Sequence, residues 1–197
     1  MLHYKASEIV ARAMTLANIQ NSSFVSAQEN RQVINDAFWE LYQIMIDAGE
    51  VCMLKQIKNP SFVDGVYKLP DDFYQLYSVK DHYGNGVLRK NKNTIKNGKC
   101  YDIRLRDFEE TVPVIDPDTG EQEVDPDTGD PVYETVIVQH TCIINYNHAL
   151  IEEIEYYPQP KTLDIEGTGD VTIEVPSNAY YQCMLYYMAI WYKTRQN

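Results

Sequence analysis

The sequence lacks most of the features that mark membrane proteins and the common enzyme classes. No stretch approaches the roughly 18 consecutive apolar residues that a transmembrane helix needs. The first residues, MLHYKASE, lack the apolar core of a signal peptide. There is no glycine-rich phosphate-binding loop and no GxSxG, HExxH or CxxC motif. We therefore expect no membrane insertion, and nothing in the sequence marks a catalytic pocket.

Metal ligands and disulfide partners are also sparse. The four cysteines, Cys52, Cys100, Cys142 and Cys183, are widely spaced in 197 residues, unlike the dense cysteines of disulfide scaffolds. This spacing favours synthesis in a reducing, intracellular compartment. His140 lies two residues from Cys142, but such a pair on a strand only shares a face, and no second cluster is close in sequence. We expect no cofactor and no metal centre.

Positive charge is scarce in the second half of the chain. The formal net charge is −12, and it is unevenly distributed. Asp107 to Pro160 contains fourteen Asp or Glu and no Lys or Arg, whereas Lys80 to Arg106 contains eight Lys or Arg and two Asp. The two blocks are either solvated faces or complementary surfaces through which copies of the chain meet head to tail. In such a contact the candidates on the basic side are Lys90, Lys92 and Lys96.

A five-residue repeat is the most unusual feature that is present. DPDTG occurs at 116–120 and again at 125–129. A calcium loop of the EF-hand type needs an oxygen ligand where Gly120 stands and a glutamate where Asp127 stands. A tight turn accounts for the residues of the repeat, because Asp accepts backbone N–H groups, Pro restricts φ and Gly readily adopts positive φ. The repeat therefore favours two turns on an exposed acidic tongue spanning residues 107–134. Its candidate contacts with a neighbouring subunit are Asp116, Asp118, Asp125 and Asp127.

Hydrophobic periodicity predicts three helices. Residues 6–19 and 27–48 each carry an apolar face, and the second begins with the capping box Ser26-Ala-Gln-Glu29. Residues 179–192 are apolar nearly all round, so the first two helices are too few to cover them. Part of this helix either packs in the protein core or faces another protein, which would be a second subunit or a portal. The candidate interface residues are Tyr180, Tyr181, Tyr187 and Trp191.

Between the helices the sequence is typical of strands separated by turns. The expected strands are residues 52–57, 65–69, 76–82, 101–106, 111–115, 132–146 and 151–157. We expect an α+β fold: a helical bundle of two N-terminal helices and a long C-terminal helix, with a β-rich antiparallel insertion lobe. In this scheme one domain with an insertion comprises N-terminal helices in 1–50, the lobe in 51–175 and the C-terminal helix in 176–197.

Several short motifs resemble those of one known family. They are YKLPDDFYQLYSV at 67–79, IEYYPQP at 154–160, Val175-Pro176, and the AYYxxxLYYxAxxY pattern at 179–192. In this order they are similar to the head-to-tail adaptor, or tail tubular, proteins of short-tailed bacteriophages, including the crAss-like group. The acidic tongue is not part of the family pattern.

The resemblance implies a structural virion protein that is made in the host cytoplasm and is not an enzyme. It implies a neck ring of about twelve copies that binds the capsid portal and downstream tail proteins and extends the DNA channel. DNA would pass without specific binding, and acidic walls suit passage because Lys and Arg would hold each phosphate. The channel-lining candidates are Glu152, Glu153 and Glu155. The alternatives are another tail or neck ring, a tail-completion protein, or a small acidic non-viral binding domain or enzyme.

Overall fold

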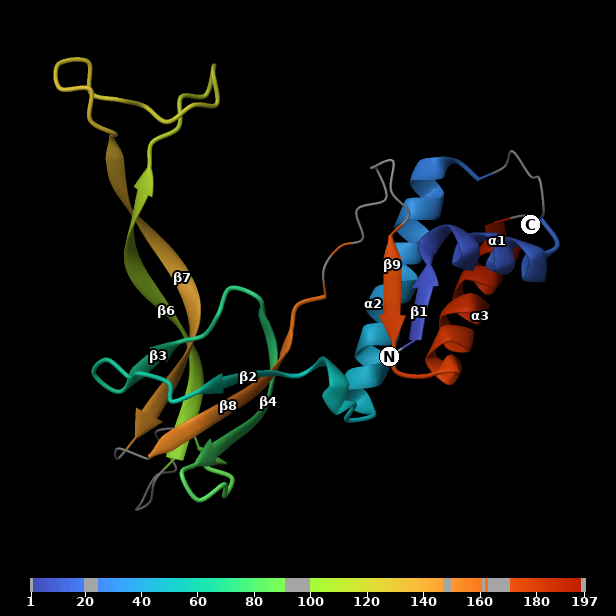
Figure 1. The fold of residues 1–197 in the computed structure, drawn as a ribbon, viewed down its shortest axis with the longest axis horizontal. Coiled ribbons are helices and arrows are strands. Elements are labelled where there is room, and N and C mark those ends of the chain that lie inside the picture. The colour runs from blue at the N-terminus through green and yellow to red at the C-terminus, as the bar shows by residue number, and fades with distance from the viewer. Residues whose placement is uncertain are drawn as a thin grey trace. The chain divides into compact units, whose positions relative to one another are not determined.

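A computed structural model describes residues 2–19, 25–90, 100–146, 150–160, 162 and 171–195. The chain forms two compact units (Figure 1). The first unit combines Met1–Leu54 with Gln159–Asn197, and the second is Lys55–Pro158. The two ends of the chain therefore belong to the same unit, and the middle of the chain forms the other.

The first unit contains helices and a two-stranded antiparallel ribbon. Its elements are β1 (Leu2–Lys5), α1 (Ala6–Ala17), α2 (Ala27–Asp47), a 3-10 turn (Val51–Met53), β9 (Thr172–Val175) and α3 (Asn178–Arg195). The ribbon pairs β1 with β9, from Leu2 opposite Val175 to Lys5 opposite Thr172. The helices α1 and α2 each pack mainly on α3, so α3 is the common support of this unit.

The start of α2 confirms the capping box read from the sequence. The Ser26 hydroxyl accepts a hydrogen bond from the Glu29 N–H at 3.1 Å, and the Glu29 carboxylate accepts one from the Ser26 N–H at 2.9 Å. Two amides that have no partner inside the helix are thereby satisfied. Arg195 at the end of α3 also donates to Glu29 at 2.7 Å. These bonds lower the pKa of Glu29 to about 2, the Ser26 backbone bond contributing most.

The helix α3 is buried on one face only, although its sequence is apolar nearly all round. The buried side chains are Tyr181, Met184, Leu185, Met188, Ala189 and Tyr192. They recur at the three- and four-residue spacing of one helix face and pack with α1 and α2. The Tyr192 hydroxyl lies in this core and donates to the Asn30 side chain at 2.6 Å. The opposite face of α3 is exposed.

The second unit is built from two sheets. Its strands are β2 (Lys55–Lys58), β3 (Val66–Lys68), β4 (Phe73–Asp81), β5 (Leu88–Arg89), β6 (Cys100–Pro113), β7 (Tyr133–Tyr146) and β8 (Ile151–Pro158). One sheet has the order β2-β8-β4, and the other has the order β3-β7-β6-β5. All neighbours are antiparallel except β5 and β6, which are parallel.

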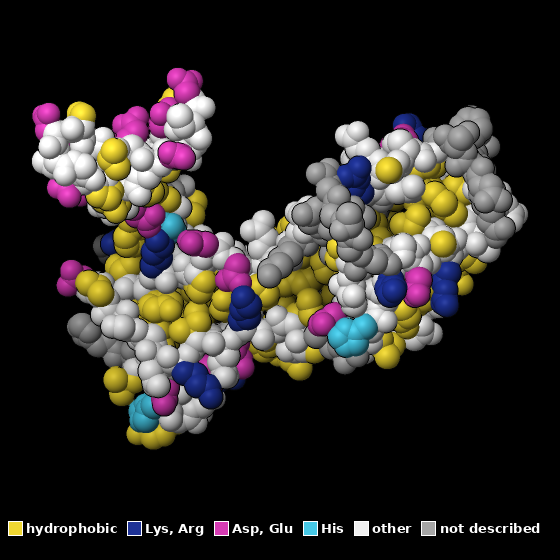
Figure 2. All heavy atoms as spheres, turned by 45° about the horizontal axis from the view of Figure 1, so that its top comes forward, with side chains coloured by type: hydrophobic (Ala, Val, Ile, Leu, Met, Phe, Trp, Pro, Cys, Tyr) yellow, Lys and Arg dark blue, Asp and Glu magenta, His cyan; other side chains and the backbone are white. Residues whose placement is uncertain are grey.

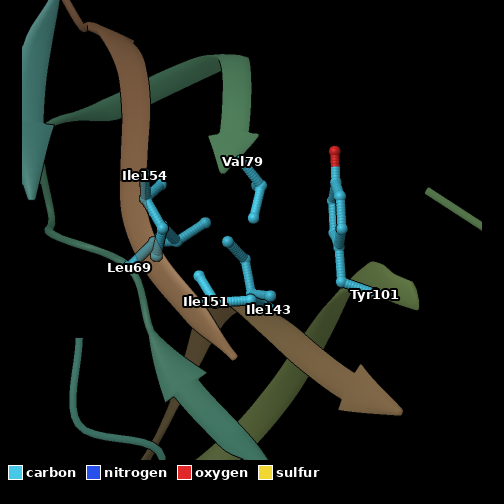
Figure 3. Close-up of a cluster of buried hydrophobic side chains, with 6 residues drawn as sticks. All are labelled: Leu69, Val79, Tyr101, Ile143, Ile151 and Ile154. Carbon is cyan, nitrogen blue, oxygen red and sulfur yellow. The ribbon is translucent and has the colours of Figure 1, made fainter. Parts of the chain in front are cut away.

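A compact cluster of apolar side chains lies between these strands (Figure 3). Its buried members are Leu69, Val79, Tyr101, Ile143, Ile151 and Ile154. In Figure 3 the side chains of Val79, Ile143, Ile151 and Ile154 point toward one another. Because these residues come from both sheets, their burial holds the second unit together.

The expected fold class, a helical bundle with a β-rich insertion, is wrong. The described residues form three helices and nine strands, and the strands hold more residues than the helices. The sequence reading missed β1, which pairs with β9 beside the helices, because a four-residue strand carries little periodic signal. It also divided β6 into two strands. No Gly, Pro or Asn interrupts Arg106 to Thr111, and one strand of fourteen residues runs through.

Candidate functional site: the β6–β7 arm

The hairpin of β6 and β7 extends beyond the core of its unit (Figure 1). The two strands pair without interruption from Cys100 opposite Tyr146 to Pro113 opposite Tyr133. Fourteen residues at about 3.4 Å each give a ladder of roughly 45 Å. The strand β3 pairs with β7 only as far as Cys142. We call the part beyond this point, residues 105–141, the arm.

The two faces of the arm differ in exposure. Leu105 and Ile137 are 62% and 74% exposed on one face. On the other face Phe108, Val136 and Val138 are half-buried. The face that carries Leu105 and Ile137 is therefore open to solvent, and the arm has no fully buried hydrophobic core of its own.

An ion-pair cluster lies at the base of the arm. The Lys68 ammonium donates to the Glu110 carboxylate, and it lies 5.9 Å from the centre of the Phe108 ring. The hydrogen bond from Lys68 is the main reason that the pKa of Glu110 lies below its usual range. His140 Nε2 is 2.8 Å from the same carboxylate, while Cys142 is buried. The His140 ring thus faces the Glu110 carboxylate, and Cys142 contributes to packing.

The tip of the arm is a junction between the end of the β6–β7 ladder and two short hairpins, 115–122 and 124–131. The Val114 N–H donates to the Val132 carbonyl at 3.1 Å, and the Val132 N–H donates to the Glu123 carbonyl at 2.9 Å. The Glu123 N–H donates to the Val114 carbonyl at 2.8 Å, so three hydrogen bonds link these three residues in a ring. These three residues are nine apart in sequence. The nine-residue repeat therefore places equivalent positions at the junction.

Each DPDTG copy forms the same turn, which confirms the turn interpretation. Asp116 Oδ1 accepts from the Asp118 N–H at 2.8 Å, and Asp125 Oδ1 accepts from the Asp127 N–H at 2.8 Å. The glycine of each copy donates its N–H to the carbonyl of the first aspartate at 2.8 Å. The two glycines have φ of +72° and +75°, a conformation that favours glycine.

The tip concentrates negative charge, as the acidic side chains in Figure 2 show. Residues 114–132 contain seven Asp or Glu and no Lys or Arg. The side chains of Asp118 and Asp127 are exposed. The backbone N–H of Asp118 is the main cause of a lowered pKa at Asp116. Among the described residues, which include the whole tip, no group of three or more His, Cys, Asp or Glu is placed to hold a metal ion.

The three glutamates of β8 occupy different environments. Lys80 Nζ lies 2.6 Å from Glu153 and 2.8 Å from Glu155, and the Lys80 hydrogen bond is the main reason that the pKa of Glu153 is lowered. The Ser78 hydroxyl donates to Glu155 at 2.6 Å. Of the three, only Glu152 is exposed, and the other two are half-buried. The three expected channel-lining residues therefore do not form one uncompensated negative patch.

The four aromatic residues singled out on α3 are also placed differently from one another. Tyr181 is 1% exposed and belongs to the core. The Tyr180 hydroxyl donates to Glu50 at 2.8 Å, and Trp191 is half-buried. Tyr187 is 37% exposed, and it is the most accessible of the four.

Two further residues on α3 were missed by the sequence reading. Tyr186 and Ile190 are 57% and 63% exposed and lie four residues apart, on the face that also exposes Tyr187. A helix that is apolar nearly all round gives no periodic signal to distinguish its exposed face from its buried face.

The basic block is only partly described. Lys90 is exposed, and its backbone N–H donates to the Tyr101 carbonyl at 2.8 Å. Lys92 and Lys96 lie outside the described residues. Nearby, Asp102 is 2.9 Å from Arg104 and 3.8 Å from Arg89, so part of the positive charge is compensated within the sheet.

Comparison of the chain with protein-family models, with curated proteins and with solved structures gives no match. No helix in the described residues is both long and apolar enough to span a bilayer. The candidate site therefore has to be interpreted from its own geometry.

Proposed function

We propose that this chain is a structural subunit of a ring in the neck of a tailed-phage virion, where it joins the portal to the tail and extends the DNA channel. The proposal rests mainly on the structure of the arm. Its continuous β6–β7 ladder extends past the core of its unit and ends in a tip made of turns. An arm of this kind suits contacts between subunits, and the sequence motifs that resemble neck adaptors point to the same role.

Several polar interactions among the described residues also suit a structural role. Carboxylates with a lowered pKa are held by hydrogen bonds: Glu29 by the Ser26 backbone N–H and then by Arg195, Asp72 by Lys55, and Glu153 by Lys80. A general acid needs a pKa near the working pH, so these lowered values do not favour acid catalysis. They favour a carboxylate that holds two elements together.

Electron microscopy of the purified protein, alone and mixed with the portal protein, tests this proposal. We expect closed rings that stack on the portal. In infected cells, loss of the protein should leave filled heads without attached tails. A label fused to the chain would then separate a ring beneath the portal from a ring further along the tail. A protein that stays monomeric with the portal and labels no virion would contradict the proposal.

A further inference from the structure

A cleft of about 440 Å³ lies beside the base of the arm. It is lined by β3, by the loop before β3 and by residues 106–108 of β6. Its lining combines apolar and aromatic residues with two cations: Val63, Val66, Tyr67, Phe108, Lys68 and Arg106. Lys68 is already paired with Glu110, so Arg106 is the cation that remains open to a ligand.

Arg106 has no acidic partner within the described part of the chain. It is exposed, and no hydrogen bond or ion pair engages its side chain there. Asp64 lines the same cleft but forms no ion pair with it. The Asp107 carboxylate accepts from the Gln139 side chain at 3.2 Å, and it lies on the opposite face of β6 from Arg106 because successive side chains of a strand alternate. The cleft thus offers one free guanidinium beside apolar and aromatic residues.

Each DPDTG turn at the tip presents a group that matches this cleft. The first aspartate of each copy is engaged in the turn, since its carboxylate accepts the N–H of the second aspartate. The second aspartates, Asp118 and Asp127, are exposed, and so are the prolines before them. Their carboxylates accept no hydrogen bond from the described residues. A proline ring therefore lies next to a free carboxylate in both turns.

We propose that a DPDTG turn of one copy docks in this cleft of a second copy. The carboxylate of Asp118 or Asp127 pairs with the Arg106 guanidinium, and the preceding proline ring packs against Tyr67 and Phe108. Arginine binds a carboxylate through two parallel hydrogen bonds, and aromatic-lined grooves commonly bind proline rings. The turn therefore matches the cleft in both its charge and its apolar part.

The turn that enters the cleft belongs to a second copy and not to the same chain. The β6–β7 register is unbroken from Cys100 to Pro113, so the ladder holds the tip away from its own base. Arg106 and Pro113 are seven positions apart, roughly 24 Å at 3.4 Å per residue. Charge selects the tip among the surfaces of the other copy, because residues 114–132 contain seven Asp or Glu and no Lys or Arg.

The contact rests on the proposed neck function in one respect, because it supplies the contact between neighbouring subunits that a ring requires. The turn and the cleft are different patches, so each copy uses its tip on one neighbour and its cleft on the other. Such head-to-tail contacts close into a ring when their rotation permits, and otherwise they build a filament. The contact can therefore be tested apart from the ring.

Two neutral variants test the two halves of the contact. Arg106→Gln removes the free cation of the cleft, and Asp118→Asn with Asp127→Asn removes the free carboxylates of the turns. Sedimentation velocity should show that the unaltered protein associates beyond twice 22.8 kDa as its concentration rises. Each variant should associate at least about tenfold more weakly, because one half of the charge pair is lost.

A mixture of the two variants tests the direction of the contact. The Arg106→Gln chain keeps its acidic turns, and the asparagine variant keeps Arg106 in its cleft. Together they should form pairs with a mass near twice 22.8 kDa and no larger species. The pairs stop growing because the turns and the cleft that remain unused in each pair are both altered.

Two matched controls separate this contact from a general effect of charge. Lys90→Gln removes an exposed cation of the same unit that does not line the cleft. Glu8→Gln with Glu152→Gln removes two exposed carboxylates outside the tip. Both controls should associate like the unaltered protein, and far-UV circular dichroism should show that every variant is folded.

The inference fails if the unaltered protein stays monomeric at about 100 μM, well above the low-micromolar affinity of a modest interface. It also fails if Lys90→Gln weakens association as much as Arg106→Gln, or if the mixed variants stay monomeric. Rings that Arg106→Gln leaves intact on the portal would contradict this contact and not the neck proposal. Pairing of the mixed variants, together with an unaltered protein that forms no ring on the portal, would contradict the neck proposal alone.

Discussion

Tyr4 stacks face to face on Tyr181, with ring centroids 3.8 Å apart and an angle of 9° between the ring planes. The Tyr181 hydroxyl also accepts a hydrogen bond from Arg12 at 3.2 Å. Tyr4 is in β1, Arg12 is in α1 and Tyr181 is in α3, so one side chain joins both ends of the chain. Tyr181 thus belongs to the core of the first unit.

Replacing Tyr181 by Ala should lower the free energy of unfolding by about 3–5 kcal/mol, the usual cost of deleting a buried aromatic ring. Tyr186→Ala is the control on the same helix. It should change the free energy by no more than about 0.5 kcal/mol because its side chain is exposed. Urea denaturation followed by far-UV circular dichroism measures both. Equal effects would contradict the assignment of Tyr181 to the core.

Deleting one nine-residue repeat, residues 123–131, should leave a folded protein. Val132 would then take the place of Glu123, and it would both donate to and accept from Val114, as in an ordinary hairpin. We expect the free energy of unfolding to change by no more than about 0.5 kcal/mol, measured by urea denaturation.

The control for this deletion is removal of residues 123–130, one residue fewer. That change shifts the register by one position and reverses which backbone groups of Val132 face Val114. If both deletions unfold the second unit equally, the junction at the tip does not explain the repeat.

Tyr192→Phe should make the protein less sensitive to alkaline pH. Burial raises the pKa of Tyr192 from 10.0 to about 12. Between pH 10 and 12 the unfolded chain loses this proton while the folded chain keeps it, so stability falls as pH rises through that window. The variant lacks this fall, although at neutral pH it should lose about 1 kcal/mol with the bond to Asn30.

The measurement is the urea midpoint of the unaltered and variant proteins from pH 8 to 12. Tyr156 in the second unit also has a pKa of about 12, because of burial and then its hydrogen bond to Asp72. Part of the alkaline loss should therefore remain in Tyr192→Phe. Parallel curves for the two proteins would show that Tyr192 does not contribute.

Glu152→Lys should leave folding unchanged and slow DNA ejection if β8 faces the channel. Glu152 is exposed, and an added cation would hold phosphates as DNA slides past. Lys80→Met should instead lower the thermal midpoint, because it leaves Glu153 and Glu155 side by side without their shared cation. Ejection rates of assembled particles and melting curves of the purified variants test the two effects. Normal ejection by Glu152→Lys particles would contradict a channel position for β8.

Features that depend on neighbouring residues were predictable from the sequence alone. Ser26 and Glu29 cap α2 because their side chains reach amides within one turn of the chain. The DPDTG copies form turns because Asp accepts N–H groups two residues on and glycine adopts positive φ. The spacing of apolar residues likewise identified where the three helices lie.

Features that depend on distant partners were decided only by the tertiary structure. Tyr181 and Tyr186 have similar neighbours in the sequence. Only the packing of β1, α1 and α2 on α3 buries Tyr181 and leaves Tyr186 exposed. Glu153 and Glu155 read as free negative charge until the pairing of β4 with β8 brings Lys80 between them. The sequence by itself determined local turns and caps, whose bonds close within a few residues. The fold decided exposure and charge compensation, because both require residues far apart in the chain to meet.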